Sequence, residues 1–431
     1  MACIYDNEII VKRLIEYGAD INKENIYGDT PLIMACINSS ENNIKYYTKF
    51  ANFGKEKNGP TLVVKAYIKR KENIVKYLIE QGANINKENV DGDTPLLEAC
   101  QNGYQTIAKY LIEHGVDVNK ENKNGDTPLI KACTCENNNE DMIKYLIEQG
   151  ADIMKVNKNG DTPLIEACQN GYQTTIKYLI EHGVDVNKEN KDGDTPLIKA
   201  CTFDGNNESI VKYLIEHGAN VNKENINGDT PLIKACLICK RNIYEYLIEH
   251  GADKEKEEID GNTPLMKTYV KAKENIVKYL IEYGADVNKE NKEGDTPLII
   301  ACTCEKNNES IISYIIEHGA DINKENKDGN TPLIKACQNG YHTIIIYLIN
   351  HGVDVNKENK DGDTALIKVC GCEKKSESIL IQLINHGADV NKENKDGDTP
   401  LTKTYRYFNE NFFKHLIKHG ADVSKIFTLE K

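Results

Sequence analysis

The sequence predicts an all-α solenoid, in which stacked helix-turn-helix pairs are separated by projecting, hairpin-like fingers. A threonine that mostly precedes Pro-Leu recurs at intervals of 33 or 35 residues after a first, shorter interval. A glycine follows this threonine after 21 residues in seven units and after 23 in four. Periods of this length are typical of repeat architectures, in which each unit buries its apolar side only against its neighbours. The threonines are Thr30, Thr61, Thr94, Thr127, Thr162, Thr195, Thr230, Thr263, Thr296, Thr331, Thr364 and Thr399.

Residues 193–228 show why each unit should form two helices. Thr195 suits a helix N-cap, because its hydroxyl accepts a hydrogen bond from a free backbone N–H. Pro196 suits the first helical position, where a missing N–H costs nothing. Apolar residues then recur at helical spacing in two short stretches, which predicts a first and an amphipathic second helix. These apolar residues are Leu197, Ile198, Ala200 and Cys201 in the first helix and Ile210, Val211, Leu214 and Ile215 in the second.

A glycine is expected to end each second helix, because glycine adopts the left-handed conformation at little cost. Between this glycine and the next threonine lies a segment rich in Asn, Asp and Gly, which suit tight turns. We call this segment a finger and expect it to project from the stack. The predicted helix stops are Gly18, Gly54, Gly82, Gly115, Gly150, Gly183, Gly218, Gly251, Gly284, Gly319, Gly352, Gly387 and Gly420.

Composition excludes several classes of partner. Lys and Arg total 54 against 67 Asp and Glu, and a formal charge of -13 repels nucleic acid and anionic lipid. The longest apolar runs are too short to cross a bilayer, and the first twenty residues lack an export pattern. Most of the fourteen cysteines recur at one repeat position, which favours reduced, packed thiols in the cytoplasm or nucleus.

The pattern resembles the ankyrin repeat over nearly all 431 residues. Gly-Asp-Thr-Pro-Leu-Ile-Lys-Ala-Cys at 193–201 and Ile-Val-Lys-Tyr-Leu-Ile-Glu-His-Gly-Ala-Asn-Val-Asn at 210–222 match that family in spacing and residue roles. The resemblance implies an ankyrin-repeat solenoid. Ankyrin repeats usually carry His after Thr-Pro-Leu, so apolar packing is expected to replace a polar clamp here. The positions concerned are Ile33, Leu97, Ile130, Ile165, Ile198, Ile233, Met266, Ile299, Ile334 and Ile367.

One irregularity divides the predicted repeats. From helix stop to turn glycine the distance is ten residues, except from Gly54 to Gly59, where it is five. We therefore expect a missing finger and a bend or gap in the row of fingers near residues 50–62. The expected organisation is a partial repeat at 1–27, a repeat with a shortened finger at 28–58, ten repeats at 59–396, and a C-terminal repeat with a tail at 397–431.

The two ends differ from the inner units. Met1-Ala2-Cys3-Ile4 repeats Met34-Ala35-Cys36-Ile37, so the chain opens in mid-repeat, and the next unit should expose apolar side chains. Our hypothesis is that this sequence is a piece of a longer repeat protein or results from an early start in the gene model. The alternative is a genuine N-terminus with a frayed half-repeat. At the other end, an aromatic cluster near Phe412 indicates a terminal unit, over which the tail 423–431 could fold back.

The side chains that could carry chemistry have structural explanations. The pairs Cys133/Cys135, Cys302/Cys304, Cys370/Cys372 and Cys236/Cys239 provide two thiols per unit, whereas zinc takes four ligands. Eight histidines directly precede a helix-stop glycine, where they suit the negative end of the helix dipole. His342 and His415 have no distinctive partner in the sequence. We therefore predict neither an enzyme nor a metal or cofactor site.

The predicted function is a non-catalytic scaffold that binds an unidentified protein partner. In ankyrin-like proteins the finger tips and the exposed side of the first helix form the concave binding surface. On the fingers this resemblance points to Glu121, Lys123, Glu189, Lys191, Glu224, Lys327 and Lys360, and on the first helices to Glu98, Lys131, Glu166, Lys199, Lys234, Lys335 and Lys368. The alternative is the recognition arm of a larger ankyrin-containing enzyme or channel. We expect a monomer in the cytoplasm or nucleus.

Overall fold

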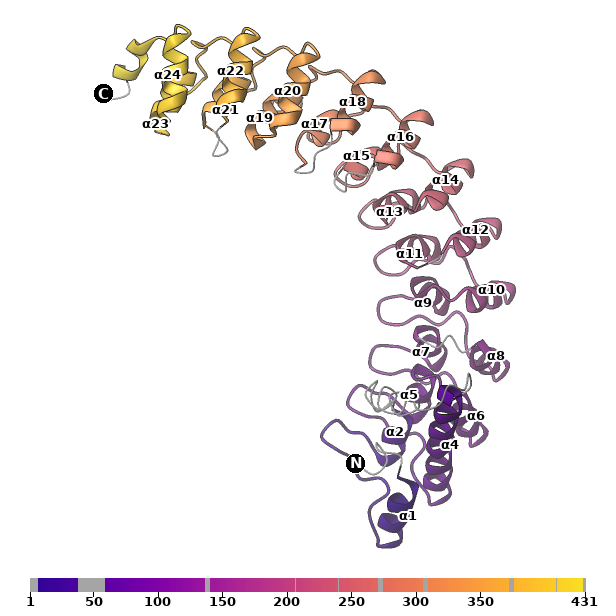
Figure 1. Cartoon of the computed structure of the whole chain (residues 1–431). Coiled ribbons are helices and arrows are strands. Elements are labelled where there is room, and N and C mark those ends of the chain that lie inside the picture. The colour runs from indigo at the N-terminus through magenta and orange to yellow at the C-terminus, as the bar shows by residue number, and fades with distance from the viewer. Residues whose placement is uncertain are drawn as a thin grey trace. The chain divides into compact units, whose positions relative to one another are not determined.

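The chain forms twenty-three α-helices and one 3-10 helix, with no β-strand among the residues that the structure describes (Figure 1). This computed structural model describes residues 7–37, 59–135, 140–205, 207–238, 240–269, 274–304, 309–371, 376–407 and 409–428, with backbone alone for 59–68, 427 and 428. The chain divides into two compact units, Met1–Asn220 and Val221–Lys431. Each unit is described by itself.

In the first unit, first helices pack on first helices and second helices on second helices, in chain order (Figure 1). The first helices are α2 (Pro31–Cys36), α5 (Pro95–Gln101), α7 (Pro128–Thr134), α9 (Pro163–Asn170) and α11 (Pro196–Thr202). The second helices are α1 (Glu8–Glu16), α4 (Gly59–Glu80), α6 (Gln105–Glu113), α8 (Glu140–Glu148), α10 (Gln173–Glu181) and α12 (Glu208–Glu216).

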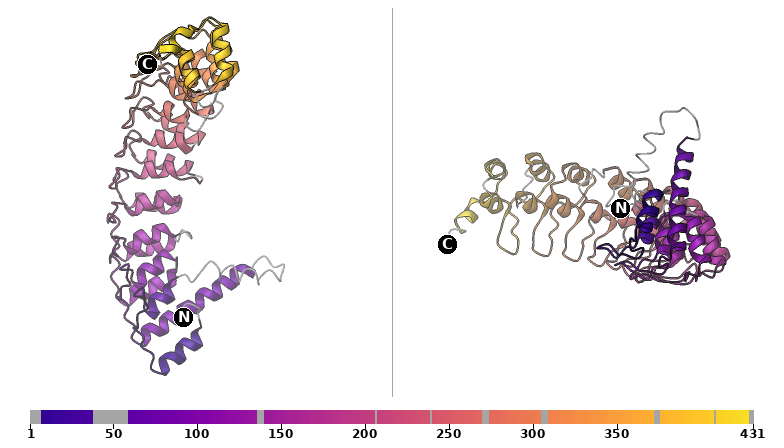
Figure 2. Two further views of the ribbon diagram at one scale, coloured as in Figure 1. Left: turned by 90° about the vertical axis from the view of Figure 1, so that its left-hand side faces the viewer. Right: turned by 90° about the horizontal axis from the view of Figure 1, so that it is seen from below.

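The second unit repeats this arrangement. Its first helices are α13 (Pro231–Ile238), α15 (Pro264–Tyr269), α17 (Pro297–Ala301), α19 (Pro332–Asn339), α21 (Ala365–Gly371) and α23 (Pro400–Arg406). Its second helices are α14 (Arg241–Glu249), α16 (Glu274–Glu282), α18 (Glu309–Glu317), α20 (His342–Asn350), α22 (Glu377–Asn385) and α24 (Glu410–Lys418). Within each unit the fingers project along one edge of the stack (Figure 2).

The predicted first helices begin as the sequence indicates. Thr195 precedes α11, and its hydroxyl accepts a hydrogen bond from the Ile198 N–H at 3.2 Å. The same bond occurs at every predicted N-cap except Thr61, which lies inside α4. The residues that stand in place of the family histidine, such as Ile198, are fully buried, which confirms apolar packing at this position.

The second helices end in a common structure. Gly183 and Gly218 have φ of +83° and +90°, and the other predicted stops are also left-handed, except Gly54, which lies outside the described residues. His217, just before such a glycine, hydrogen-bonds through Nδ1 to the Tyr213 carbonyl at 2.8 Å and stacks on the Tyr213 ring. Because a carbonyl only accepts, Nδ1 carries the proton. All eight histidines before a stop glycine make this bond, so their predicted capping role is confirmed.

The expected gap in the row of fingers is wrong. The finger at 19–29 lies directly beside the finger at 83–93, because the Val90 N–H donates to the Tyr27 carbonyl at 2.8 Å and the Asn84 N–H donates to Asn22 Oδ1 at 2.8 Å. The fingers pair over the interval that was expected to interrupt them. The segment 38–58, including Gly54, lies outside the described residues.

Helix α4 explains why the fingers stay paired. It is a single helix of 22 residues that packs against α2, and its N-terminal half projects from the stack (Figure 2). The buried Lys71 ammonium of α4 donates to the carbonyls of Ala35 at 3.3 Å and Ile37 at 3.0 Å, at the C-terminal end of α2. We infer that α2 and the C-terminal half of α4 form one repeat with a long connection, in place of two repeats that meet near residue 58.

At the C-terminal end, the 3-10 helix η1 (Val423–Thr428) packs against α23. The Asp422 N–H donates to Asn391 Oδ1 at 2.7 Å, which joins this segment to the last finger. The tail therefore folds back on the last helix pair, as expected, up to residue 428.

Candidate protein-binding surface

Adjacent fingers are joined through their backbones. The Lys191 N–H donates to the Asn159 carbonyl at 2.8 Å, and equivalent bonds link other neighbouring fingers. The turn glycine of each finger makes this approach possible. A Cβ built on Gly160, at φ +81°, would lie 2.9 Å from the Lys191 nitrogen. Glycine is required here both for its backbone conformation and for the space that it leaves.

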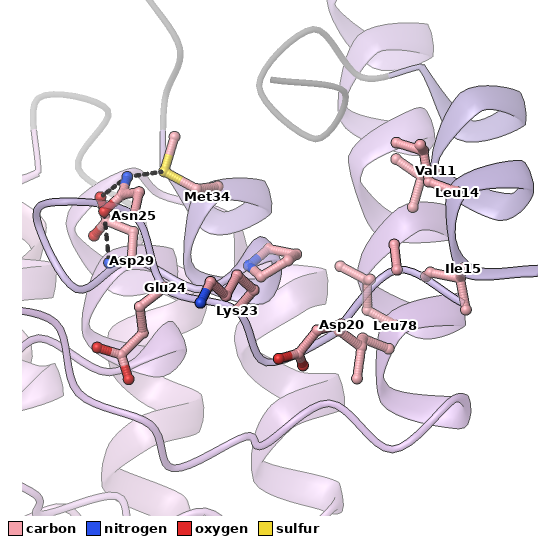
Figure 3. A pocket seen from close by; sticks show the side chains of 13 residues that line it. Val11, Leu14, Ile15, Asp20, Lys23, Glu24, Asn25, Asp29, Met34 and Leu78 are labelled. Atoms are coloured by element: carbon pink, nitrogen blue, oxygen red, sulfur yellow. Dashed lines mark hydrogen bonds between the residues drawn. The ribbon is translucent and has the colours of Figure 1, made fainter. Parts of the chain in front are cut away.

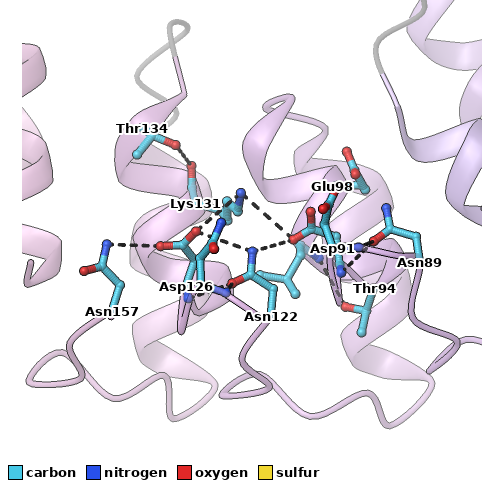
Figure 4. A network of polar contacts seen from close by, with 12 residues as sticks. Asn89, Asp91, Thr94, Glu98, Asn122, Asp126, Lys131, Thr134 and Asn157 are labelled. Atoms are coloured by element: carbon cyan, nitrogen blue, oxygen red, sulfur yellow. Dashed lines mark hydrogen bonds and ion pairs between the residues drawn. The ribbon is translucent and has the colours of Figure 1, made fainter. Parts of the chain in front are cut away.

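A second set of bonds uses an asparagine that is buried in most fingers (Figure 4). Asn122 Oδ1 accepts from the Asn124 and Asp126 N–H groups at 2.9 Å, which fixes the turn. Asn122 Nδ2 donates to Asp93 of the preceding finger at 2.8 Å. Asn157 donates to Asp126 in the same way at 3.1 Å. This Asn–Asp ladder supplies the polar contact between repeats that the loss of the family histidine was expected to remove.

The outer side of the fingers carries two further links. Asn119 Nδ2 donates to the Gly150 carbonyl at 2.9 Å, and its Oδ1 accepts from the Asp152 N–H at 2.7 Å. Beside this bridge, Lys155 pairs with Glu121 at 2.8 Å, and most fingers repeat the Lys–Glu pair. The fingers therefore form a bonded row, and their charged side chains are held at regular intervals.

On the first helices, lysines are half-buried and paired with the aspartate of their own finger. Lys199 lies 3.0 Å from Asp194, Lys234 lies 2.6 Å from Asp229, and Lys368 lies 2.7 Å from Asp363. Lys131 lies 3.5 Å from Asp126 and 4.0 Å from Asp93 (Figure 4). Lys335 differs, because its finger has Asn330 in place of the aspartate. Lys335 therefore makes no ion pair among the described residues.

Comparison with known proteins agrees with this geometry. The family described as "Ankyrin repeats (3 copies)" matches in overlapping segments from residue 47 to residue 426, and "Ankyrin repeats (many copies)" matches residues 1–46. The chain belongs to the ankyrin repeat family. It is also similar to "Ankyrin repeat protein OPG189" of Variola virus, including the isolate Human/India/Ind3/1967, with 34% identity over 92 residues. The match covers 21% of this chain and 16% of the viral protein.

The finger residues predicted for binding fall into two groups in this ankyrin repeat chain. Lys123, Lys191, Lys327 and Lys360 stand at exposed finger tips and make no ion pair with any described residue. Glu121 and Glu224 are exposed but belong to the Lys–Glu pairs on the finger sides, while Glu189 is an exposed glutamate at the same position. The lysines point outward from the bonded row, whereas the glutamates help to hold it together.

Glu98 and Glu166 occupy the first-helix position that holds lysine in most ankyrin repeats of this chain. Burial, followed by the charges of Asp93 and Asp29, raises the pKa of Glu98 to about 7, although Lys131 and Asn102 oppose the shift. Burial, Asp161 and Asp126 likewise raise the pKa of Glu166 to about 7. Glu98 lies beside the Asn–Asp ladder, and the nearby Lys131 is shared with Asp93 and Asp126 (Figure 4).

The double substitution Glu98→Gln and Glu166→Gln is expected to stabilise the chain at pH 8 and to flatten its pH dependence. Because the folded pKa lies above the ordinary 4.5, the folded state binds extra protons between pH 4.5 and about 7, so stability falls as pH rises through this window. The gain at pH 8 should be about 1 kcal/mol per site after solvent screening. Urea unfolding at pH 5 and 8 measures it. The exposed Glu121→Gln change is the control; an equal gain from it would contradict the explanation.

An apolar hollow of about 370 Å³ lies at the N-terminal end of the ankyrin stack (Figure 3). Val11, Leu14 and Ile15 of α1 line it together with Met34 of α2 and Leu78 of α4. Leu14 is 49% exposed, and Ile9, nearby on α1, is 76% exposed. The expected exposure of apolar side chains at this end is therefore found, because α1 has no first helix beside it among the described residues.

The cysteines are packing residues wherever the structure describes them. Eleven are free thiols outside any disulfide, and ten of these are buried; Cys3, Cys239 and Cys372 lie outside the described residues. Burial raises the pKa of Cys133 and Cys302 well above the ordinary value, so both stay protonated. No group of three or more Cys, His, Asp or Glu in the described ranges could hold a metal ion. No described helix is long and apolar enough to cross a membrane.

His342 and His415 have partners that the sequence did not reveal. Ser378 Oγ lies 3.3 Å from His342 Nδ1, and Glu377 lies 2.6 Å from His415 Nε2. Each contact joins the beginning of α22 to a neighbouring second helix. The partners lie 36 and 38 residues away in the chain, so only the stacking of repeats brings them together.

Proposed function

We propose that this ankyrin repeat chain is a non-catalytic scaffold that holds a protein partner on its fingers and first helices. The observation that carries the proposal is the contrast within each finger. The base and sides are fixed by bonds to neighbouring fingers, while the tip lysines Lys123, Lys191, Lys327 and Lys360 are exposed and unpaired among the described residues. Within each unit, ammonium groups on a fixed row of fingers lose little conformational entropy of the backbone on binding, which favours multivalent recognition.

The rest of the proposal follows from charge and thiol chemistry. A net charge of -13 disfavours nucleic acid and anionic membranes as partners. None of the eleven described cysteines forms a disulfide, which supports a reducing compartment, and we propose the cytoplasm or nucleus. We further propose that the chain acts as a monomer without a cofactor.

The test is reversal of the tip charges. Lys123, Lys191, Lys327 and Lys360 are replaced together by glutamate, and the tagged chain is used to capture proteins from native extract. We expect the captured partner to be lost, because the change places repulsive charge at each contact. The control replaces four second-helix lysines, Lys76, Lys109, Lys177 and Lys278, and therefore makes the same change in net charge away from the fingers. Equal capture by both variants would contradict the proposed surface.

A further inference from the structure

Two adjacent fingers in the middle of the chain have apolar tips, as do the first two fingers, which carry Tyr27 and Val90. Seven fingers carry a tip lysine, namely Lys123, Lys158, Lys191, Lys292, Lys327, Lys360 and Lys395. The fingers at 219–229 and 252–262 carry Ile226 and Ile259 at that position, and these side chains are 60% and 53% exposed. The Ile259 N–H donates to the Asn227 carbonyl at 3.1 Å, so the two tips are held side by side. A pair of exposed isoleucines on a bonded row is a candidate contact for a partner.

A hollow of about 520 Å³ lies between these two fingers. Both isoleucines line it, together with Gly228, five carboxylates and one ammonium. Glu224, Glu257 and Glu258 pair with Lys256, Lys289 and Lys267, whereas Asp253 and Glu255 make no ion pair among the described residues. The carboxylates are Glu224, Asp253, Glu255, Glu257 and Glu258, and the ammonium is Lys256. The hollow therefore combines an apolar rim with an excess of negative charge, although most finger tips on the chain are positive.

The excess charge arises because the finger at 252–262 lacks two asparagines. Glu258 stands where other fingers have the buried ladder asparagine, and a carboxylate cannot donate to Asp229 of the preceding finger. Each carboxylate instead takes its own lysine: Lys234 lies 2.6 Å from Asp229, and Lys267 lies 2.5 Å from Glu258. The Asn–Asp ladder is therefore interrupted at this step.

Glu255 replaces the asparagine that bridges the outer side of the fingers. It accepts from the Asp286 N–H at 2.9 Å, as the asparagines do, but it brings a negative charge. Burial, followed by the charge of Asp286, raises its pKa, although the Asp286 N–H, Lys289 and Lys254 oppose the shift. A cationic group of a ligand in the hollow would compensate this negative charge.

We propose that this hollow is a docking subsite for a segment of another protein in which an apolar side chain is flanked by lysine or arginine. The apolar side chain lies against Ile226 and Ile259, and the flanking cations face Glu255 and Asp253. Burial of the apolar contact provides affinity, and the opposed charges set the register of the segment. This inference rests on the proposed scaffold function and names one partner chemistry within it.

The first experiment measures binding of labelled peptides to the full chain by fluorescence anisotropy at physiological salt. The probe is Gly-Lys-Arg-Leu-Lys-Arg-Gly; the controls are Gly-Lys-Arg-Ser-Lys-Arg-Gly and Gly-Glu-Glu-Leu-Glu-Glu-Gly. We expect the leucine peptide to bind about tenfold more tightly than the serine peptide, and the acidic peptide to bind weakest. Equal affinity for the leucine and serine peptides would show that the chain binds them by unspecific charge attraction alone, and it would overturn the proposal.

The second experiment changes the fingers. The variant Ile226→Lys, Ile259→Lys, Glu255→Asn and Glu258→Asn gives both fingers the residues of their neighbours, so folding should be preserved and the preference for leucine lost. A transplant variant, Lys327→Ile, Lys360→Ile, Asn356→Glu and Asn359→Glu, places the same features on two other fingers and should gain a second site for the leucine peptide. An unchanged preference in the first variant, or no added binding in the transplant, would overturn the subsite. If reversal of the tip lysines abolished partner capture but the chain did not prefer the leucine peptide, the scaffold function would be supported and this subsite would be excluded.

Discussion

Replacement of Asn190 by alanine is expected to destabilise the chain by about 3 kcal/mol, because three hydrogen bonds of a buried side chain are lost. Asn190 Nδ2 donates to Asp161 of the preceding finger at 2.7 Å, and its Oδ1 accepts from the Asp192 and Asp194 N–H groups at 3.0 and 2.9 Å. The side chain is 8% exposed, so water cannot easily take over these bonds. Urea unfolding and hydrogen exchange at the two amides measure the loss.

Asn187, in the same finger, provides the matched control. It also joins two repeats, since its Nδ2 donates to the Gly218 carbonyl at 2.9 Å and its Oδ1 accepts from the Asn220 N–H at 2.7 Å. These bonds face solvent, and Asn187→Ala should therefore cost only about 1 kcal/mol. Comparable losses for the two variants would show that the buried ladder contributes no more than the outer bridge. In either case the loss should concentrate in neighbouring repeats, because the stability of a solenoid is set by nearest neighbours.

The second large effect is expected at Gly160. Alanine there must adopt the left-handed backbone, at a cost of about 1 kcal/mol, and its Cβ would also press on the Lys191 and Asn190 backbone. Relief of that clash breaks the Lys191 to Asn159 bond, so a total loss of about 3 kcal/mol is expected. Thermal and urea unfolding of Gly160→Ala measure it.

Gly183→Ala separates the two contributions. Gly183 has nearly the same φ, +83° against +81°, but no atom lies within 4 Å of a Cβ built on it. Its replacement should therefore cost only the backbone strain, about 1 kcal/mol. If Gly160→Ala destabilised the chain no more than Gly183→Ala, the clash of a Cβ with the neighbouring finger would contribute nothing, which would contradict the close approach of the fingers.

Local chemistry made most of the fold predictable. Thr195 and Pro196 define where a helix begins, Gly218 defines where one ends, and His217 caps its carbonyls, all within a few residues of chain. The interval from Gly54 to Gly59 misled the prediction because motif spacing assumes that each motif marks a repeat. In the structure Gly59 begins a continuous helix, and the fingers on either side of this interval pair directly.

The chemistry between repeats was harder to predict. Asn122 was predicted as a turn residue, and it does hold the turn, but its bond to Asp93 depends on a neighbouring unit. The raised pKa of Glu98 likewise depends on Asp29, far away in the chain. Ile226 and Ile259 were overlooked because a search for the repeat pattern favours what the units share. Their departure from the common lysine was visible in the sequence and could have marked them.

The contact of Lys71 with the end of α2 means that the first complete repeat is held together by non-covalent contacts more than by the chain that connects its two helices. Its ammonium neutralises the negative end of that helix from a residue 34 positions beyond Ile37, and the neighbouring fingers are joined independently of the chain that separates them. We therefore expect that sequence inserted between residues 37 and 59 would leave the register along the stack unchanged.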